Sequence, residues 1–205
     1  MYLSDNELLK AIRAGDLIVN PQPKKIESSS IDLHLDTVEQ ARVWDIDKYN
    51  AEQVIPGNDA FELRIGKFRY KEFAPKYLIP PPENPEKPVF RRHNQIIVKP
   101  GGFLLWQTKE IVGTPEQDAK FIAFIDGKST KARAGLIVHL TAPTIHATWS
   151  GNVTLEIANL GPFYLVLQED DSIAQIVVAT ISSPPSENMK KGITHGQVQV
   201  TAAAK

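Results

Sequence analysis

Residues 127–135, Gly-Lys-Ser-Thr-Lys-Ala-Arg-Ala-Gly, concentrate groups that could hold an anion. Lys128, Ser129, Thr130 and Arg133 offer hydroxyls and cations between two glycines. A phosphate chain needs several donors and positive charge at close range. The spacing of a Walker phosphate loop is absent. The segment therefore has two interpretations, a phosphate-binding loop and an ordinary solvated loop.

A carboxylate that could move a proton stands in an alternating segment, Val-Thr-Leu-Glu-Ile-Ala-Asn, at residues 153–159. The alternation predicts a strand with Val153, Leu155 and Ile157 on one face and Glu156 on the other. A Glu on such a face usually points into solvent. If that face lines a pocket instead, a partly desolvated carboxylate can act as a base near neutral pH.

The histidines predict no metal site. The chain has no cysteine, which excludes disulfides and Cys-ligated zinc, and it lacks the sequence pattern of zinc-dependent deaminases. We interpret His139 and His146 as hydrogen-bonded structural residues. Gln197 lies in a polar tail whose local sequence favours disorder.

The elements that must position these residues are mostly strands. Ser4 and Glu7 form a capping box, Leu3 and Leu8 a hydrophobic staple, and Gly15 a stop, which predicts a short N-terminal helix. Apolar or alternating runs predict strands at residues 31–35, 96–98, 103–106, 121–125, 136–140, 153–157, 164–167 and 173–178. Short strands at this spacing indicate a mainly β protein, a sandwich or barrel.

Length and composition indicate one domain over residues 1–205. Residues 41–94 are an irregular excursion that includes the proline-rich stretch 80–88, and residues 186–205 form a mobile tail. Hydrophobic residues make up 42%, enough for a core, and the net charge of −1 is not that of a binder of long nucleic acid. No signal peptide or membrane-length apolar run is seen, so we expect a cytoplasmic protein with no membrane partner.

Taken in chain order, these segments resemble the dCTP deaminase family, in the superfamily shared with trimeric dUTPases. The resemblance covers most of the chain. It rests on the N-terminal helix, on Ser-Ser-Ser-Ile-Asp-Leu at 28–33, on the 127–135 segment, on Thr-Ala-Pro-Thr-Ile-His-Ala-Thr-Trp-Ser-Gly at 141–151 followed by Leu155 and Glu156, and on Ser-Ile-Ala-Gln at 172–175. Several motifs in the right order are more specific than any one of them.

The resemblance implies a dUTPase-like distorted β-barrel or jelly roll, assembled as a homotrimer with pockets between subunits. It implies zinc-independent deamination of dCTP to dUTP and ammonia, with Glu156 activating water and Ser129 and Arg133 as further catalytic residues. Mg²⁺ would accompany the triphosphate, and dTTP would inhibit. The implied substrate-binding residues are Lys128, Ser129, Thr130, Arg133, Ala142, Thr144, His146, Gln175 and Gln197.

Departures from the family pattern leave alternatives open. His146 replaces an Asp that helps dUTPases activate water at the phosphate, which argues against diphosphatase activity. Ile193 and Thr194 replace the usual Lys-Tyr before Gln197, and Asp170 replaces a Gly in the late turn. The alternatives are a dUTP diphosphatase or a bifunctional deaminase and diphosphatase, a non-catalytic nucleotide-binding protein on the same fold, and a modified cytosine nucleotide as substrate.

Overall fold

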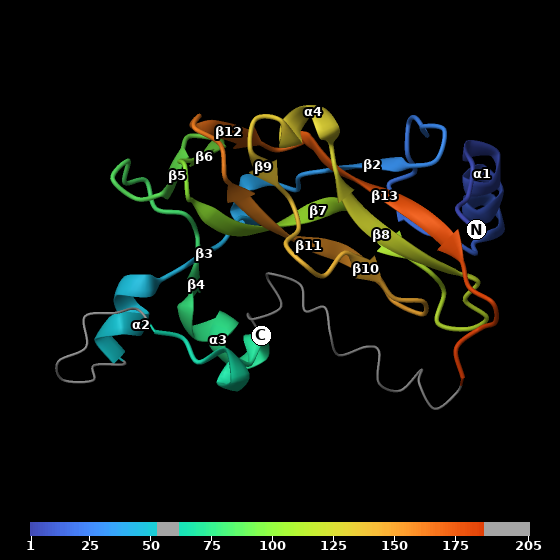
Figure 1. Cartoon of the computed structure of the whole chain (residues 1–205), viewed down its shortest axis with the longest axis horizontal. Helices are drawn as coiled ribbons and strands as arrows, with labels where there is room; N and C mark the ends of the chain where they lie inside the picture. The colour runs from blue at the N-terminus through green and yellow to red at the C-terminus, as the bar shows by residue number, and fades with distance from the viewer. Residues whose placement is uncertain (53–61, 187–205) are drawn as a thin grey trace.

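The computed structural model describes residues 1–52 and 62–186. Its N-terminal helix α1 (Asp5–Ala14) has the expected punctuation: Ser4 and Glu7 form a capping box, and Gly15 closes the helix in the left-handed conformation with φ 75°. Leu3 and Leu8 are both buried. The N-terminal helix predicted from capping signals is therefore confirmed, and its buried side belongs to the core (Figure 1).

The rest of the framework is antiparallel sheet, so the mainly β prediction is confirmed. One four-stranded sheet has the order β1-β7-β11-β9, a second has the order β10-β8-β13-β2, and a smaller one has the order β12-β6-β5. The strands are β1 (Ile18–Asn20), β2 (Ile31–His34), β5 (Val89–Arg92), β6 (Gln95–Val98), β7 (Phe103–Gly113), β8 (Phe121–Gly127), β9 (Leu136–Ile137), β10 (Thr144–Ile145), β11 (Ser150–Asn159), β12 (Leu165–Gln168) and β13 (Ser172–Thr180).

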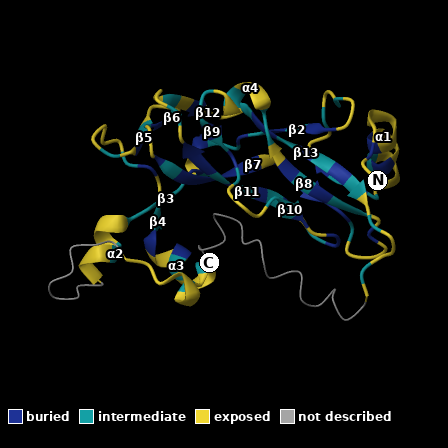
Figure 2. Ribbon diagram, in the orientation of Figure 1, coloured by how far each residue is buried: buried dark blue, intermediate teal, exposed yellow. Residues whose placement is uncertain are grey.

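A single hydrophobic cluster joins α1 to the sheets. Trp106 on β7 is fully buried, and its indole N–H donates to the carbonyl of Thr37 at 3.0 Å. Leu33 on β2, Leu155 on β11 and Ile176 on β13 are also fully buried. Figure 2 shows burial running along the strands, whereas α2 (Ile46–Glu52), below them, is exposed. The two larger sheets therefore provide the rigid frame on which a site can be held.

The strand predicted over residues 136–140 is shorter than expected. Strand β9 ends at Ile137, because it pairs with β11 only through Ala158 and Asn159. Beyond it the chain leaves the sheet and returns as β10, which pairs with β8. The intervening residues are thereby free to line a cavity instead of continuing a strand.

The excursion at residues 41–94 contains more regular structure than its sequence suggests. Its described parts hold β3 (Val43–Trp44), α2, a 3-10 turn (Ile65–Lys67), α3 (Tyr70–Tyr77), β4 (Leu78–Ile79) and β5, and β3 pairs with β4. A further 3-10 turn (Val38–Gln40) precedes it. Figure 1 shows α2 and α3 below the strands, on the side opposite the short helix α4 (Ser129–Ala132).

Candidate active site

A cavity of about 720 Å³ lies between the excursion and the β frame. That volume is in the range of small-molecule pockets. One wall comes from Trp44, Asp45, Ile46, Tyr49, Leu63, Ile65, Phe68, Tyr70, Phe73 and Tyr77, and the other from Phe103, Leu105, Ile125, His139, Leu140, Thr141, Ala142, Val153, Thr154, Leu155 and Glu156. Two parts of the chain that are distant in sequence thus build one pocket.

Edge-to-face aromatic packing holds the excursion's wall together. Trp44 meets Phe68 with ring centroids 6.0 Å apart and Tyr70 at 6.2 Å, both near perpendicular. Tyr49 meets Tyr77 at 5.3 Å in the same manner. Such pairs contribute beyond their buried area, roughly 0.5–1.5 kcal/mol each. The wall is therefore a packed aromatic cluster, suited to a flat ring.

Glu156 supplies a carboxylate from the strand side of this cavity, and Asp45 supplies another from the excursion's wall. Glu156 stands on β11 opposite Leu105 of β7, while its neighbours Leu155 and Ile157 are buried on the other face. The alternation predicted for this strand is confirmed, and the Glu156 face lines a pocket. Burial raises the pKa of the Glu156 carboxyl above its ordinary value, and a backbone hydrogen bond from Leu140 and the nearby His139 offset this only in part. A raised pKa suits a proton carrier.

Two further polar groups in the cavity were not singled out from the sequence as functional. The hydroxyl of Tyr70 and Nδ1 of His139 are buried and have no hydrogen-bond partner among the described residues. For Nδ1, His139 differs from the hydrogen-bonded structural residue that we expected from the sequence. No local pattern could have marked Tyr70, because its partnerless state depends on the packing of distant segments.

The cationic segment at residues 127–135 lies outside the cavity lining. Lys128 precedes the one-turn helix α4, and its Nζ pairs with Asp32 Oδ1 at 2.5 Å. Ser129, Thr130 and Arg133 are exposed. Within one chain, α4 and the α3 wall are on opposite sides of the strands (Figure 1). The structure thus leaves these groups available to something outside their own chain.

The remaining expected substrate-binding residues are dispersed. Ala142 lines the cavity with Glu156. Thr144 on β10, the exposed His146 and Gln175 on β13 are not among the lining residues, and Gln175 Oε1 accepts a hydrogen bond from Ser30 Oγ at 3.1 Å. Gln197 lies outside the described residues.

Over residues 1–52 and 62–186 there is no group of three or more His, Asp or Glu side chains arranged to hold a metal ion. Across the same ranges, no helix has the length and apolar character needed to cross a membrane.

Comparisons with known proteins place the chain in a family. The sequence model of a family described as dCTP deaminase-like matches residues 2–181. The chain belongs to the dCTP deaminase family. A protein named "dCTP deaminase, dUMP-forming" from Nocardioides sp. is 34% identical to this dCTP deaminase family member over 90% of the chain and 82% of that protein. One named "dCTP deaminase" from Buchnera aphidicola is 27% identical over 90% and 86% of the two chains.

The fold of this dCTP deaminase family member also matches a solved structure. The crystal structure of a 2′-deoxycytidine 5′-triphosphate deaminase from Agrobacterium tumefaciens superposes with a TM-score of 0.56 at 16% identity, covering 92% of this chain. The match spans 50% of that chain, so our protein corresponds to about half of its length. At this identity the likeness establishes the fold alone.

Proposed function

We propose that the protein deaminates dCTP hydrolytically to dUTP and ammonia, without zinc, and that Glu156 activates the water. The observation that carries the proposal is a carboxylate with a raised pKa in a cavity whose opposite wall is aromatic. Relatives named dCTP deaminase support the same chemistry. The sequence-based expectation of a cytoplasmic enzyme stays part of this proposal.

The chemistry needs one group that takes a proton and returns it. Glu156 accepts a proton as water attacks C4 of the cytosine ring, and it then gives that proton to ring N3. Glu156 next takes the proton of the new C4 hydroxyl and gives it to the amino group. The C4–N bond then breaks, the amino group departs as ammonia, and the oxygen of the water stays on C4 as a carbonyl. General acid–base catalysis of this kind contributes roughly 10²–10⁴-fold. The backbone near Ala142 and the Ser129 hydroxyl would position the water and the departing amino group.

The phosphate groups would bind to α4 of a neighbouring subunit. Ser129, Thr130 and Arg133 are exposed and do not line the cavity that holds Glu156. A homotrimer with sites between subunits would bring one chain's α4 to the next chain's cavity, which would place cations and hydroxyls beside the triphosphate. Lys128, paired with Asp32, would contribute positive charge at the start of this helix.

Magnesium fits this arrangement as a companion of the triphosphate. The described residues offer no carboxylate cage. Protein-bound Mg²⁺ commonly keeps several waters and is held largely through substrate phosphates. The ion would neutralise phosphate charge near Arg133, and the proton transfers would stay with Glu156.

A second candidate is formation of dUMP, with pyrophosphate released after deamination. The names of relatives such as the Nocardioides protein, "dCTP deaminase, dUMP-forming", favour it. The exposed His146, at a place where an Asp serves dUTPases, speaks against it. We propose inhibition by dTTP and closure of the segment with Gln197 over the nucleotide for both candidates, the dUTP-forming and the dUMP-forming reaction.

The test is incubation of the purified protein with dCTP and Mg²⁺, with separate assays for ammonia, dUTP, dUMP and pyrophosphate. Ammonia with dUTP is the expected result. Ammonia with dUMP and pyrophosphate would select the second candidate. Binding of dCTP without any product would instead support a nucleotide-binding protein that lacks turnover, and a parallel 5-substituted dCTP would reveal a modified substrate.

A further inference from the structure

The hydroxyl of Tyr70 differs from the other tyrosine hydroxyls of the aromatic wall. Tyr49 donates to the carbonyl of Glu62 at 3.0 Å, and Tyr77 donates to Glu52 Oε2 at 2.7 Å. The Tyr70 hydroxyl is buried and has no partner among the described residues. A buried donor without a partner is destabilising. Such a group is retained most readily where a ligand completes its hydrogen bonding.

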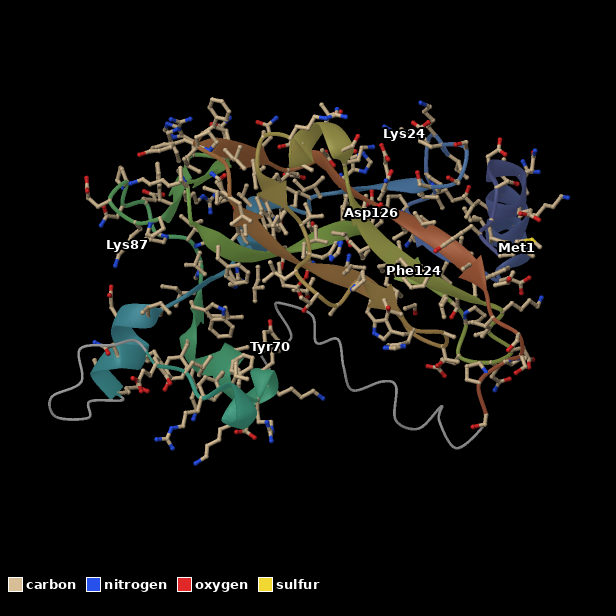
Figure 3. The ribbon with its side chains drawn as sticks, in the orientation of Figure 1. Met1, Lys24, Tyr70, Lys87, Phe124 and Asp126 are labelled. Atoms are coloured by element: carbon tan, nitrogen blue, oxygen red, sulfur yellow. The ribbon has the colours of Figure 1, made fainter. Side chains whose placement is uncertain are left out.

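Tyr70 is held in a fixed position on the side of the excursion that faces the strands. It begins α3, and its ring packs edge-to-face on Trp44 with centroids 6.2 Å apart. Figure 3 shows Tyr70 between α3 and the strands above it. The nearby guanidinium of Arg42 donates to the carbonyls of Glu39 and Ala41. Tyr70 itself is one of the residues that line the cavity, and its hydroxyl is enclosed beside that wall.

Glu156 lies within electrostatic range of this hydroxyl. Burial raises the pKa of the Tyr70 hydroxyl, and the charge of Glu156 raises it further, while Arg42 lowers it. The phenol is therefore protonated at neutral pH and can both donate and accept a hydrogen bond. No hydrogen bond joins Tyr70 to Glu156 in the described structure.

We propose that the Tyr70 hydroxyl contacts the substituent at C4 of the pyrimidine bound against Glu156. The inference rests on the proposed function, because Glu156 must reach C4 and N3 and so fixes which edge of the ring enters this part of the cavity. A phenol suits both ends of the reaction. It accepts a hydrogen bond from the amino group of cytosine and donates one to the carbonyl oxygen of the uracil that replaces it.

The experiment compares two nucleotides on three proteins: the unmodified chain, Tyr70→Phe and the control Tyr49→Phe. The nucleotides are dCTP and the 2-pyrimidinone deoxyribonucleoside triphosphate, which carries only hydrogen at C4. Tyr70→Phe is expected to raise the KM for dCTP about tenfold with a smaller change in kcat. The dissociation constant of the 2-pyrimidinone nucleotide is measured in proteins that also carry Glu156→Gln, so that no water is added at C4. It is expected to stay within about twofold, because the bound nucleotide has no C4 group to lose.

Equal weakening of both nucleotides by Tyr70→Phe would show a structural role and overturn the proposal, as would no change in either. Tyr49→Phe removes a hydroxyl that already has a protein partner, so it is expected to show no preference between the nucleotides. If the unmodified chain releases no ammonia, the proposed function fails, and the dCTP comparison is then made by calorimetry because dCTP stays intact. Absence of dCTP binding would overturn both proposals.

Discussion

Glu156 connects the position of a single residue to the pH dependence of the reaction. A base must be ionised, and burial raises the pKa of this carboxyl above its ordinary value of 4.5. We expect kcat/KM for dCTP to rise with pH through an apparent pKa above 4.5 and then to level off. A pH profile of initial rates measures this. A profile that is already flat from pH 4.5 upward would assign the proton transfer to another group.

The same pKa shift predicts a cost in stability. Because the folded-state pKa of Glu156 is raised, the folded state binds more protons than the unfolded state between pH 4.5 and the raised value, and stability falls as pH rises through that window. The full cost is present once the pH is above the raised pKa. Glu156→Gln should therefore melt higher than the unmodified chain at pH 7, and the difference should shrink below pH 4.5. A lower Tm for Glu156→Gln at pH 7 would contradict this.

At the scale of elements, the turn between α4 and β9 depends on two glycines in contact. Gly135 has φ +93°, and a Cβ placed on it would lie 2.1 Å from the backbone nitrogen of Gly161. Gly135→Ala should therefore destabilise the fold by more than about 1 kcal/mol and disturb α4. Gly101→Ala is the matched control, since Gly101 has φ +79° with open space around it. Chemical denaturation measures the free energy of unfolding of both variants. Equal losses in the two would show that backbone strain alone, and not the close contact with Gly161, causes the destabilisation.

The elements also show where sequence reasoning succeeds. Capping residues around α1 and the alternation in β11 act locally, so both elements could be predicted from the sequence. The alternation in β11 also predicted which face of the strand carries Glu156. The two residues of β10 are a strand only because Thr144 and Ile145 pair with Phe124 and Ala123 of β8. Helix α3 includes Pro75, a residue that argues against a helix, yet tertiary packing maintains it.

The candidate site could be predicted only in part for the same reason. Glu156 and the cationic segment at 127–135 were recognisable from residue types and chain order. The aromatic wall was not, because residues 44–77 show no regular spacing and meet the strands only after folding. The structure also explains Asp170, which stands where the family pattern has a Gly. Asp170 adopts φ 62°, the conformation that explains a Gly preference at that turn, and Asp tolerates this better than most residues.

At the scale of the whole molecule, the separation of α4 from the cavity predicts complementation between inactive chains. Ser129→Ala and Glu156→Gln should each be inactive alone. If the protein forms the proposed trimer, mixed trimers made by co-expression should regain activity, because about a quarter of all sites in a random equal mixture would carry both native residues. Ammonia release from dCTP measures it, and light scattering checks the trimer. Inactive mixed trimers would place both residues in a single-chain site.

Whether Glu156 performs the proton transfers in dCTP deamination is tested by Glu156→Gln. Ammonia release from dCTP should be followed for the unmodified chain and the variant, with dCTP affinity measured for the variant by calorimetry. We expect a loss of turnover of at least about 100-fold, with dCTP binding largely retained. A variant that binds dCTP and still releases ammonia at near the unmodified rate would contradict it.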